Sequence, residues 1–195
     1  MSDNSQKYNS RNPFVKYAIR RFFNTLRGLL IEAGAENILD AGCGEGFYIH
    51  YLAKNYPLSL NITGIDSSFE SLSLAKKLNP KQNFIQGNIY RIPYKNKSFD
   101  LVLCLEVLEH LEGVGSALTE LCRVARRYCL LSIPQEPYFS ICRLLGGKNI
   151  LRLGRHPQHL HQFQAKKMIK MLEDYFLVKK TVNSFPWIFI FGELR

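Results

Sequence analysis

The sequence lacks any apolar run that approaches the roughly 20 residues needed to span a membrane. Residues 1–10 are polar, without the apolar centre of a signal peptide, and no internal repeat or low-complexity tract is present. A membrane-spanning, secreted or fibrous protein is therefore not expected. What remains is a chain of 195 residues, 46% of them apolar, which is long enough for one domain with a sizeable core.

Paired cysteines are missing as well. The five cysteines are odd in number, and no two of them form a Cys-x-x-Cys motif. They lie in apolar or helical contexts at positions 43, 104, 122, 129 and 142. This arrangement indicates buried thiols in a reducing compartment, so we expect a cytoplasmic protein.

Acidic residues are few. The chain has 16 of them against 26 lysines and arginines, which gives a formal net charge of +10. Such a charge fits an anionic partner, for example RNA, an anionic lipid surface or an acidic substrate. A basic surface without any such partner fits the charge equally well.

Glycines, by contrast, gather in one stretch. The run 37–47 reads Asn-Ile-Leu-Asp-Ala-Gly-Cys-Gly-Glu-Gly-Phe. An apolar run that ends in Asp40, followed by three glycines and a helical pattern, predicts a buried strand, a tight turn and a helix N-terminus. Such a turn lets a ligand approach main-chain N–H groups and the positive end of a helix. We therefore expect it to receive a carboxylate or a polar tail.

The third glycine of a dinucleotide-binding Gly-x-Gly-x-x-Gly motif is missing, because Phe47 stands in its place. The order Asp-x-Gly-x-Gly-x-Gly instead resembles motif I of class I S-adenosylmethionine-dependent methyltransferases. In that family the turn lies against the methionine part of the cofactor, and the acid helps to hold its ammonium group. The resemblance implies that the cofactor is bound by Asp40, Gly42, Cys43, Gly44 and Gly46.

A second acid follows at a fitting distance. Residues 60–66 predict a strand that ends in Asp66, about 24 residues after Gly42, and one crossover helix returns a parallel strand over that distance. A carboxylate there can accept hydrogen bonds from both ribose hydroxyls, with Ser67 beside it. Capping the helix expected at 68–78 is an alternative role, and both roles can apply.

The adenine side is predicted from the segment 87–93. It resembles the family's Gly-Asp-x-x-x-Leu-Pro segment, whose acid bonds the adenine amino group. Asn88 replaces that acid, and its amide oxygen can still accept a hydrogen bond. The resemblance places Ile89 against the adenine face. It also places Leu105, at the end of the expected strand 98–105, beside the cofactor.

The resemblance covers residues 36–193 and implies an α/β fold. We expect a Rossmann-like, seven-stranded class I methyltransferase sheet with helices on both faces and an antiparallel C-terminal hairpin. We divide the chain into an N-terminal helical extension, 1–35, and a methyltransferase domain, 36–195. In the extension, apolar residues recur at helical spacing over 14–33 with basic residues between them. This favours a helix packed on the domain, and a basic lid or membrane-surface helix is the alternative.

A second group of residues follows the fourth strand, where substrate would meet cofactor. On a helical turn Glu106 would share a face with Glu109 and His110. Oxygens with one imidazole suit Mg²⁺ or Mn²⁺. The segment resembles small-RNA 2′-O-methyltransferases, whose Glu-x-x-Glu-His and a later histidine hold a divalent ion, and His159 corresponds to that histidine. Gln158 replaces the acid that precedes it in that family.

The same Glu-x-x-Glu-His motif also stands in ubiquinone-biosynthesis O-methyltransferases and in methyltransferases not known to need a metal. There its histidine can orient a substrate hydroxyl or act as a general base. We rank a catalytic role of Glu106 and His110 at the substrate first, the metal site second and a purely structural role third.

The acceptor is inferred from what surrounds these motifs. Residues 138–155 mix apolar and basic residues without an acid, which suits an amphiphilic or anionic substrate. An appended RNA-binding domain and an aromatic-plus-basic stacking run are missing. We therefore expect methyl transfer from S-adenosylmethionine to a small-molecule acceptor, lipid-like or anionic, through an oxygen nucleophile. RNA ribose 2′-O-methylation and a non-catalytic, cofactor-binding regulatory partner are the alternatives.

Overall fold

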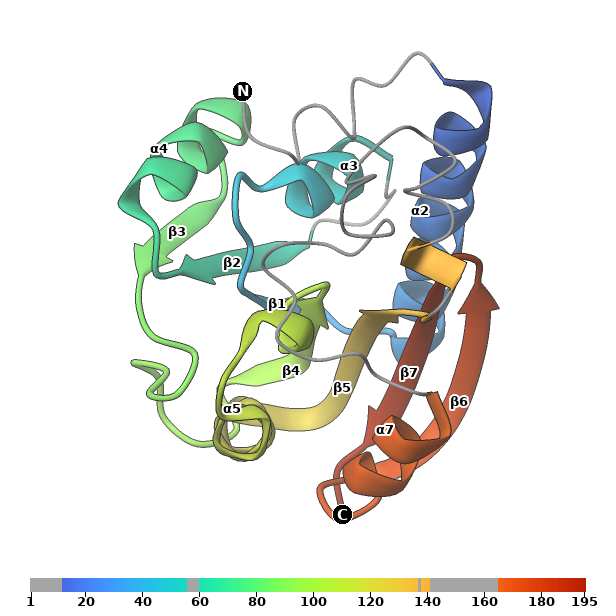
Figure 1. Cartoon of the computed structure of the whole chain (residues 1–195). Helices are drawn as coiled ribbons and strands as arrows, with labels where there is room; N and C mark the ends of the chain where they lie inside the picture. The colour runs from blue at the N-terminus through green and yellow to red at the C-terminus, as the bar shows by residue number, and fades with distance from the viewer. Residues whose placement is uncertain (1–11, 56–59, 137, 141–164) are drawn as a thin grey trace.

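The computed structural model describes residues 12–55, 60–136, 138–140 and 165–195. Within them, seven strands form one sheet in the order β3-β2-β1-β4-β5-β7-β6 (Figure 1). The strands are β1 Asn37–Ala41, β2 Asn61–Asp66, β3 Asn83–Gln86, β4 Phe99–Leu105, β5 Ala125–Pro134, β6 Leu177–Ser184 and β7 Trp187–Glu193. The pairs from β3 to β5 are parallel, and β7 runs antiparallel to both β5 and β6. The predicted sheet with its antiparallel hairpin is confirmed.

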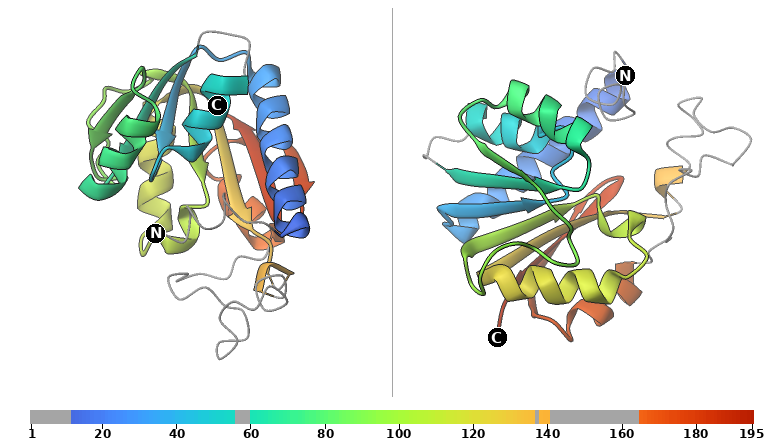
Figure 2. Two further views of the ribbon diagram at one scale, coloured as in Figure 1. Left: turned by 90° about the horizontal axis from the view of Figure 1, so that it is seen from above. Right: turned by 90° about the vertical axis from the view of Figure 1, so that its left-hand side faces the viewer.

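Helices cover both faces of the sheet, so the molecule has three layers (Figure 2). The helices are α2 Pro13–Ala33, α3 Phe47–Asn55, α4 Phe69–Leu78, α5 Val114–Val124 and α7 Ala165–Leu172. Along β4, Leu101, Leu103 and Leu105 lie in one core with α2, α3 and α4. Val102 and Cys104 lie in the opposite core with α5 and α7. This alternation is the two-residue period of a strand buried on both faces.

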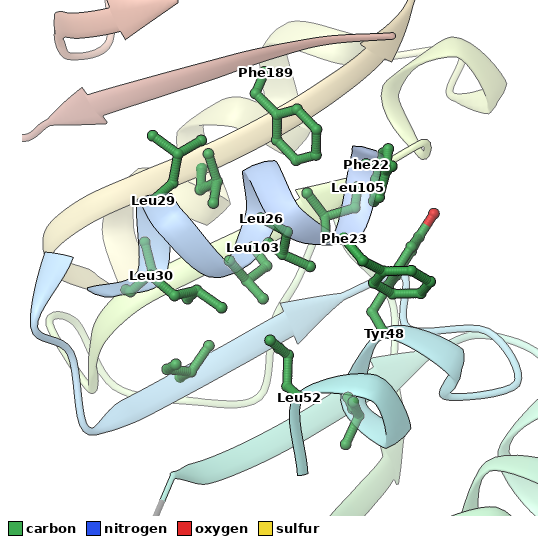
Figure 3. Close-up of a cluster of buried hydrophobic side chains, with 14 of the residues drawn as sticks. Phe22, Phe23, Leu26, Leu29, Leu30, Tyr48, Leu52, Leu103, Leu105 and Phe189 are labelled. Atoms are coloured by element: carbon green, nitrogen blue, oxygen red, sulfur yellow. The ribbon is translucent and has the colours of Figure 1, made fainter. Parts of the chain in front are cut away.

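Helix α2 packs its apolar stripe onto the sheet (Figure 3). Its first turn is capped by Asn12, whose side chain accepts from the N–H of Phe14, and it ends at Gly34 in the left-handed conformation. Six of its side chains are buried, including Phe22, Leu26 and Leu30. The interpretation of a helix packed on the domain is thus confirmed. The boundary at residue 35 stays a prediction, but α2 shares one core with the strands on its side of the sheet.

The end of α5 differs from the prediction. The sequence favours a helix over 115–126, with Arg126 and Arg127 at its C-terminus. In the structure α5 ends at Val124, and Ala125 is extended and pairs with Phe99 of β4. Arg126 therefore lies on β5, where it forms an ion pair with Asp100 at 2.9 Å. Pairing with β4 outweighs the helical periodicity of these residues, since tertiary contacts override propensity.

Among the described helices, none is both long enough and apolar enough to cross a bilayer.

Candidate cofactor and active site

The predicted site residues of the glycine turn, of β2 and of the end of β4 lie at the edge of the sheet where β1 and β4 are neighbours. The strand order reverses here, with β2 and β3 on one side and β5 on the other. In open α/β sheets this switch point, at the carboxyl ends of the strands, is where ligands bind. The turn that follows β1, the end of β2 and the segment that follows β4 all reach this edge.

Asp40 is a carboxylate buried in this edge without a partner. It is 1% exposed, and neither of its oxygens has a hydrogen-bond partner among the described residues. Burial and, to a smaller degree, the nearby charge of Asp66 raise the pKa of Asp40 from 3.8 to about 7. Because an unpaired buried carboxylate is costly, this arrangement fits a cation that arrives with the ligand.

The glycine turn does not offer its amides to a ligand in the way the sequence suggests. Gly42, Gly44 and Gly46 do have positive φ, at 81°, 52° and 74°. However, the N–H groups of Gly42 and Cys43 donate to the carbonyl oxygen of Ile65 at 2.8 and 3.0 Å. The turn is therefore fastened to the end of β2. The expectation of an amide cradle for a carboxylate is wrong for these donors.

Asp66 also holds the glycine turn against the end of β2. Its Oδ2 accepts from the N–H of Gly44 at 2.8 Å, and its Oδ1 accepts from the N–H of Ser68 at 2.9 Å. Ser68, not Asp66, caps α4, because its hydroxyl accepts from the N–H of Ser71. Each carboxylate oxygen has a second lone pair, so Asp66 retains capacity for the ribose hydroxyls.

The remaining predicted cofactor residues lie around this turn. Cys43 is buried, and burial raises the pKa of its thiol. Ser67 is exposed, whereas Leu105 is buried at the last position of β4. Asn88 is exposed at the end of β3, and its Oδ1 accepts from the N–H of Tyr90 at 2.9 Å. That oxygen can accept one more hydrogen bond, while Ile89 is half-buried beside it.

Glu106 departs most from its predicted geometry. Its backbone is left-handed, with φ 56°, and the helical turn begins only at Leu108. It therefore does not share a helical face with Glu109 and His110. Its Oε2 accepts from the hydroxyl of Tyr48 at 2.6 Å, and its Oε1 accepts from the indole N–H of Trp187. A strained residue held by such contacts is typical of a functional site.

The metal set is not assembled by the described residues. Glu109 is 1% exposed and His110 is half-buried, in a 3₁₀ turn that runs Leu108–His110. Within the described part of the chain, no group of three or more His, Cys, Asp or Glu side chains could hold a metal ion. His159 lies outside the described residues. Both Glu106 oxygens are held by Tyr48 and Trp187, so the described residues do not fit a Mg²⁺ or Mn²⁺ site.

Two residues of this network escape sequence reasoning. Tyr48 comes from α3 and Trp187 from β7, and they lie 58 and 81 positions from Glu106 in the chain. Phe22 of α2 stacks on Tyr48 at 5.3 Å between ring centroids and meets Trp187 edge-on at 5.2 Å. The sequence signal for Tyr48 is its position two residues after the last glycine of the turn.

The edge is acidic although the protein is basic. Asp40, Asp66, Glu106 and Glu109 all lie at or near it, while the formal net charge is +10. Opposite charges attract most strongly where water is excluded. The site is thus suited to S-adenosylmethionine, which carries a sulfonium and an ammonium group.

A sheet ordered 3-2-1-4-5-7-6 in which only β7 is reversed is the sheet of the class I S-adenosylmethionine-dependent methyltransferase fold. Comparison with protein families agrees with the geometry. Residues 39–133, which run from β1 into β5, match the family described as "Methyltransferase domain".

Individual relatives differ in their acceptors. The chain is 35% identical over 96 residues to norajmaline N-methyltransferase of Rauvolfia serpentina, which covers 46% of this chain and 32% of the relative. It is 30% identical over 151 residues to ubiquinone biosynthesis O-methyltransferase of Rickettsia conorii, which covers 74% of this chain and 50% of the relative. The chain thus spans half or less of the length of these two relatives.

Among solved structures, magnesium protoporphyrin IX methyltransferase from Synechocystis PCC 6803 with bound SAH is similar. The TM-score is 0.73 at 19% identity, and the match covers 100% of this chain and 95% of that chain. At this identity the likeness concerns the fold.

Proposed function

We propose that the protein transfers a methyl group from S-adenosylmethionine to an oxygen of a small molecule. The observation that supports it best is the buried, unpartnered Asp40 beside a glycine turn at the switch point. Asp40 would pair with the ammonium group of the cofactor, and Asp66 with its ribose hydroxyls. Asn88 and Ile89 would contact the adenine.

The cofactor supplies a methyl group activated by the sulfonium. The acceptor oxygen attacks the methyl carbon as the carbon–sulfur bond breaks, and the electron pair of that bond stays on sulfur. His110 would accept the proton of the acceptor hydroxyl, which lowers the cost of forming the nucleophile. Glu106, anchored by Tyr48 and Trp187, would keep the end of β4 in place and lend negative charge near the sulfonium.

The acceptor is proposed as lipid-like or anionic from the apolar and basic residues at 138–155. A cytoplasmic location is proposed because the four cysteines in the described residues carry free thiols.

The test is a methyl-transfer assay with labelled S-adenosylmethionine. Its acceptors are a catechol, a prenylated phenol, a primary amine and an RNA with a free 3′ ribose. We expect transfer to one of the two phenolic acceptors. Replacement of His110 by alanine should lower the rate by roughly 10²–10⁴-fold with little change in cofactor affinity. His50→Ala, which removes a half-buried histidine of α3, is the matched control.

Transfer to the amine alone would contradict the proposal that the acceptor atom is oxygen. Transfer to the RNA alone would contradict the proposal that the acceptor is a small molecule. An absence of cofactor binding would contradict the whole proposal.

A further inference from the structure

The segment that carries the predicted adenine contacts has little regular structure of its own. Between Gly87 and Ser98 the described chain contains no helix and no strand, and its single bridge joins Asn88 to Arg91. Other parts of the molecule must therefore fix its shape. Its neighbour along much of its length is helix α5 on the same face of the sheet.

Arg123, in the last turn of α5, holds the far end of this segment. Its guanidinium donates to the carbonyl oxygens of Ile92 at 2.8 Å and Tyr94 at 2.7 Å, and to Oδ1 of Asn96 at 3.1 Å. The planar fork of arginine makes this possible, because it offers five donors in fixed directions.

Glu120 binds both Arg123 and the backbone of the segment. It accepts from Arg123 through both oxygens at 2.7 Å, and it accepts from the N–H of Ile92 at 2.8 Å. The hydrogen bond from Arg123 lowers the pKa of Glu120, so the pair is charged at neutral pH. The two side chains are 28% and 17% exposed, which limits screening by water.

Two further ties join the same helix to the segment. The N–H of Gly113, just before α5, donates to the Tyr90 hydroxyl at 3.3 Å. The N–H of Lys97 donates to the carbonyl oxygen of Arg123 at 2.9 Å. Helix α5 thus holds both ends of the segment that follows Asn88 and Ile89.

We propose that Arg123 and Glu120 are positioning residues for the adenosine end of the cofactor. They act through the segment 88–97, whose backbone they hold in the shape that presents Asn88 and Ile89 to the adenine. The inference rests on the adenine placement in the proposed function. It predicts that the pair governs affinity for the adenosine part of a ligand and not for its amino-acid part.

Two ligands separate these parts. S-adenosylhomocysteine contains both, whereas 5′-methylthioadenosine contains the adenosine and the sulfur without the amino-acid end. Calorimetric titration of Arg123→Met should show both ligands binding about tenfold more weakly, by the same factor, which corresponds to about 1.4 kcal/mol. Asp40→Asn should weaken only S-adenosylhomocysteine, because 5′-methylthioadenosine has no ammonium group.

Two variants control for a general loss of structure. Arg127→Met breaks the ion pair between Arg127 of β5 and Glu193 of β7 and should leave both affinities unchanged. The double variant Glu120→Arg/Arg123→Glu restores an ion pair on α5 but cannot donate from position 123 to the carbonyl oxygens of the segment. We expect it to recover thermal stability without recovering affinity. If Arg123→Met does not fold, Glu120→Gln should show the same equal loss for both ligands, to a smaller degree.

Recovery of affinity in the double variant would overturn the inference, because helix stability alone would then explain the effect. So would an unequal loss for the two ligands, an unchanged affinity in Arg123→Met, or a wild-type protein that binds S-adenosylhomocysteine but not 5′-methylthioadenosine. A wild-type protein that binds neither ligand would instead overturn the proposed function.

Discussion

Asp40 differs from Asp66 and Glu106 in the hydrogen-bond donors that surround its carboxylate. Asp66 accepts two backbone hydrogen bonds and Glu106 accepts from Tyr48 and Trp187, so the charge of each is stabilised by donors. Asp40 is buried and has no such donor among the described residues. Its charged form is therefore stabilised only when a cation binds, and this couples its protonation to the cofactor.

Cofactor affinity should consequently depend on pH through Asp40. Its pKa in the free protein is raised to about 7, so below that value binding of the ammonium group must release a proton. Affinity for S-adenosylhomocysteine should rise by up to about tenfold per pH unit from pH 5 to 7 and then level off. Asp40→Asn should abolish this dependence and weaken binding at pH 7.5 by roughly 1.5–3 kcal/mol. Calorimetry in buffers with different ionisation enthalpies measures the released proton directly.

The free protein should show the opposite trend in stability. Because the folded pKa of Asp40 is raised, its contribution to stability is fully present below about pH 3.8 and is lost as the pH rises through about 7. Urea unfolding from pH 5 to 8 would show a smaller decline in Asp40→Asn than in the wild type. An equal decline in both proteins would assign the trend to other groups.

The candidate site was predictable where its residues are close in sequence. Asp40 and Asp66 lie at the carboxyl ends of β1 and β2, and the glycine turn follows β1, so neighbouring parallel strands place them at one edge. The surroundings of Glu106 were not predictable, since its partners come from distant elements and its left-handed backbone contradicts the helical spacing of the motif. Local periodicity cannot report a contact made across the sheet.

At the scale of elements, the strands were predicted better than the helix ends. The run Leu101–Leu105 is apolar throughout and is bounded by the acids Asp100 and Glu106, which strongly favours a buried strand. The end of α5 was misplaced because Ala125, Arg126 and Arg127 suit a helix as well as a strand, and pairing with Phe99 decides between them. Boundaries set by long-range pairing are not visible in local sequence.

Two glycines allow a matched test of packing between elements. Gly28 lies within α2, and no atom lies within 4 Å of the position that a β-carbon would take there, so alanine should stabilise the protein by about 0.5–1 kcal/mol through helix propensity. Gly192 of β7 lies directly under the ring of Phe176, and an added β-carbon would overlap that ring. Gly192→Ala should therefore cost about 1–3 kcal/mol. Urea unfolding of both variants measures the difference, and effects of the same sign would contradict this packing.

At the scale of the whole molecule, the two faces of the sheet have different tasks. Helix α5, on one face, is hydrogen-bonded to the segment 88–97 near both of its ends. Helices α2 and α3, on the other face, bring Phe22 and Tyr48 to Glu106. The residues proposed for the cofactor and for the acceptor are thus supported from opposite layers of the molecule.

Helix α2 should consequently unfold together with the sheet and not as a separate extension. Leu26 is fully buried between α2 and the strands (Figure 3), so Leu26→Ala should cost about 2–5 kcal/mol in the free energy of unfolding. Asn24→Ala, at an exposed position of the same helix, should change it by no more than about 0.5 kcal/mol. Urea unfolding should follow one transition by both circular dichroism and Trp187 fluorescence, since Trp187 is the single tryptophan and contacts Phe22. A separate early transition, or a Leu26→Ala cost as small as that of Asn24→Ala, would instead make residues 12–33 an independent appendage of the domain.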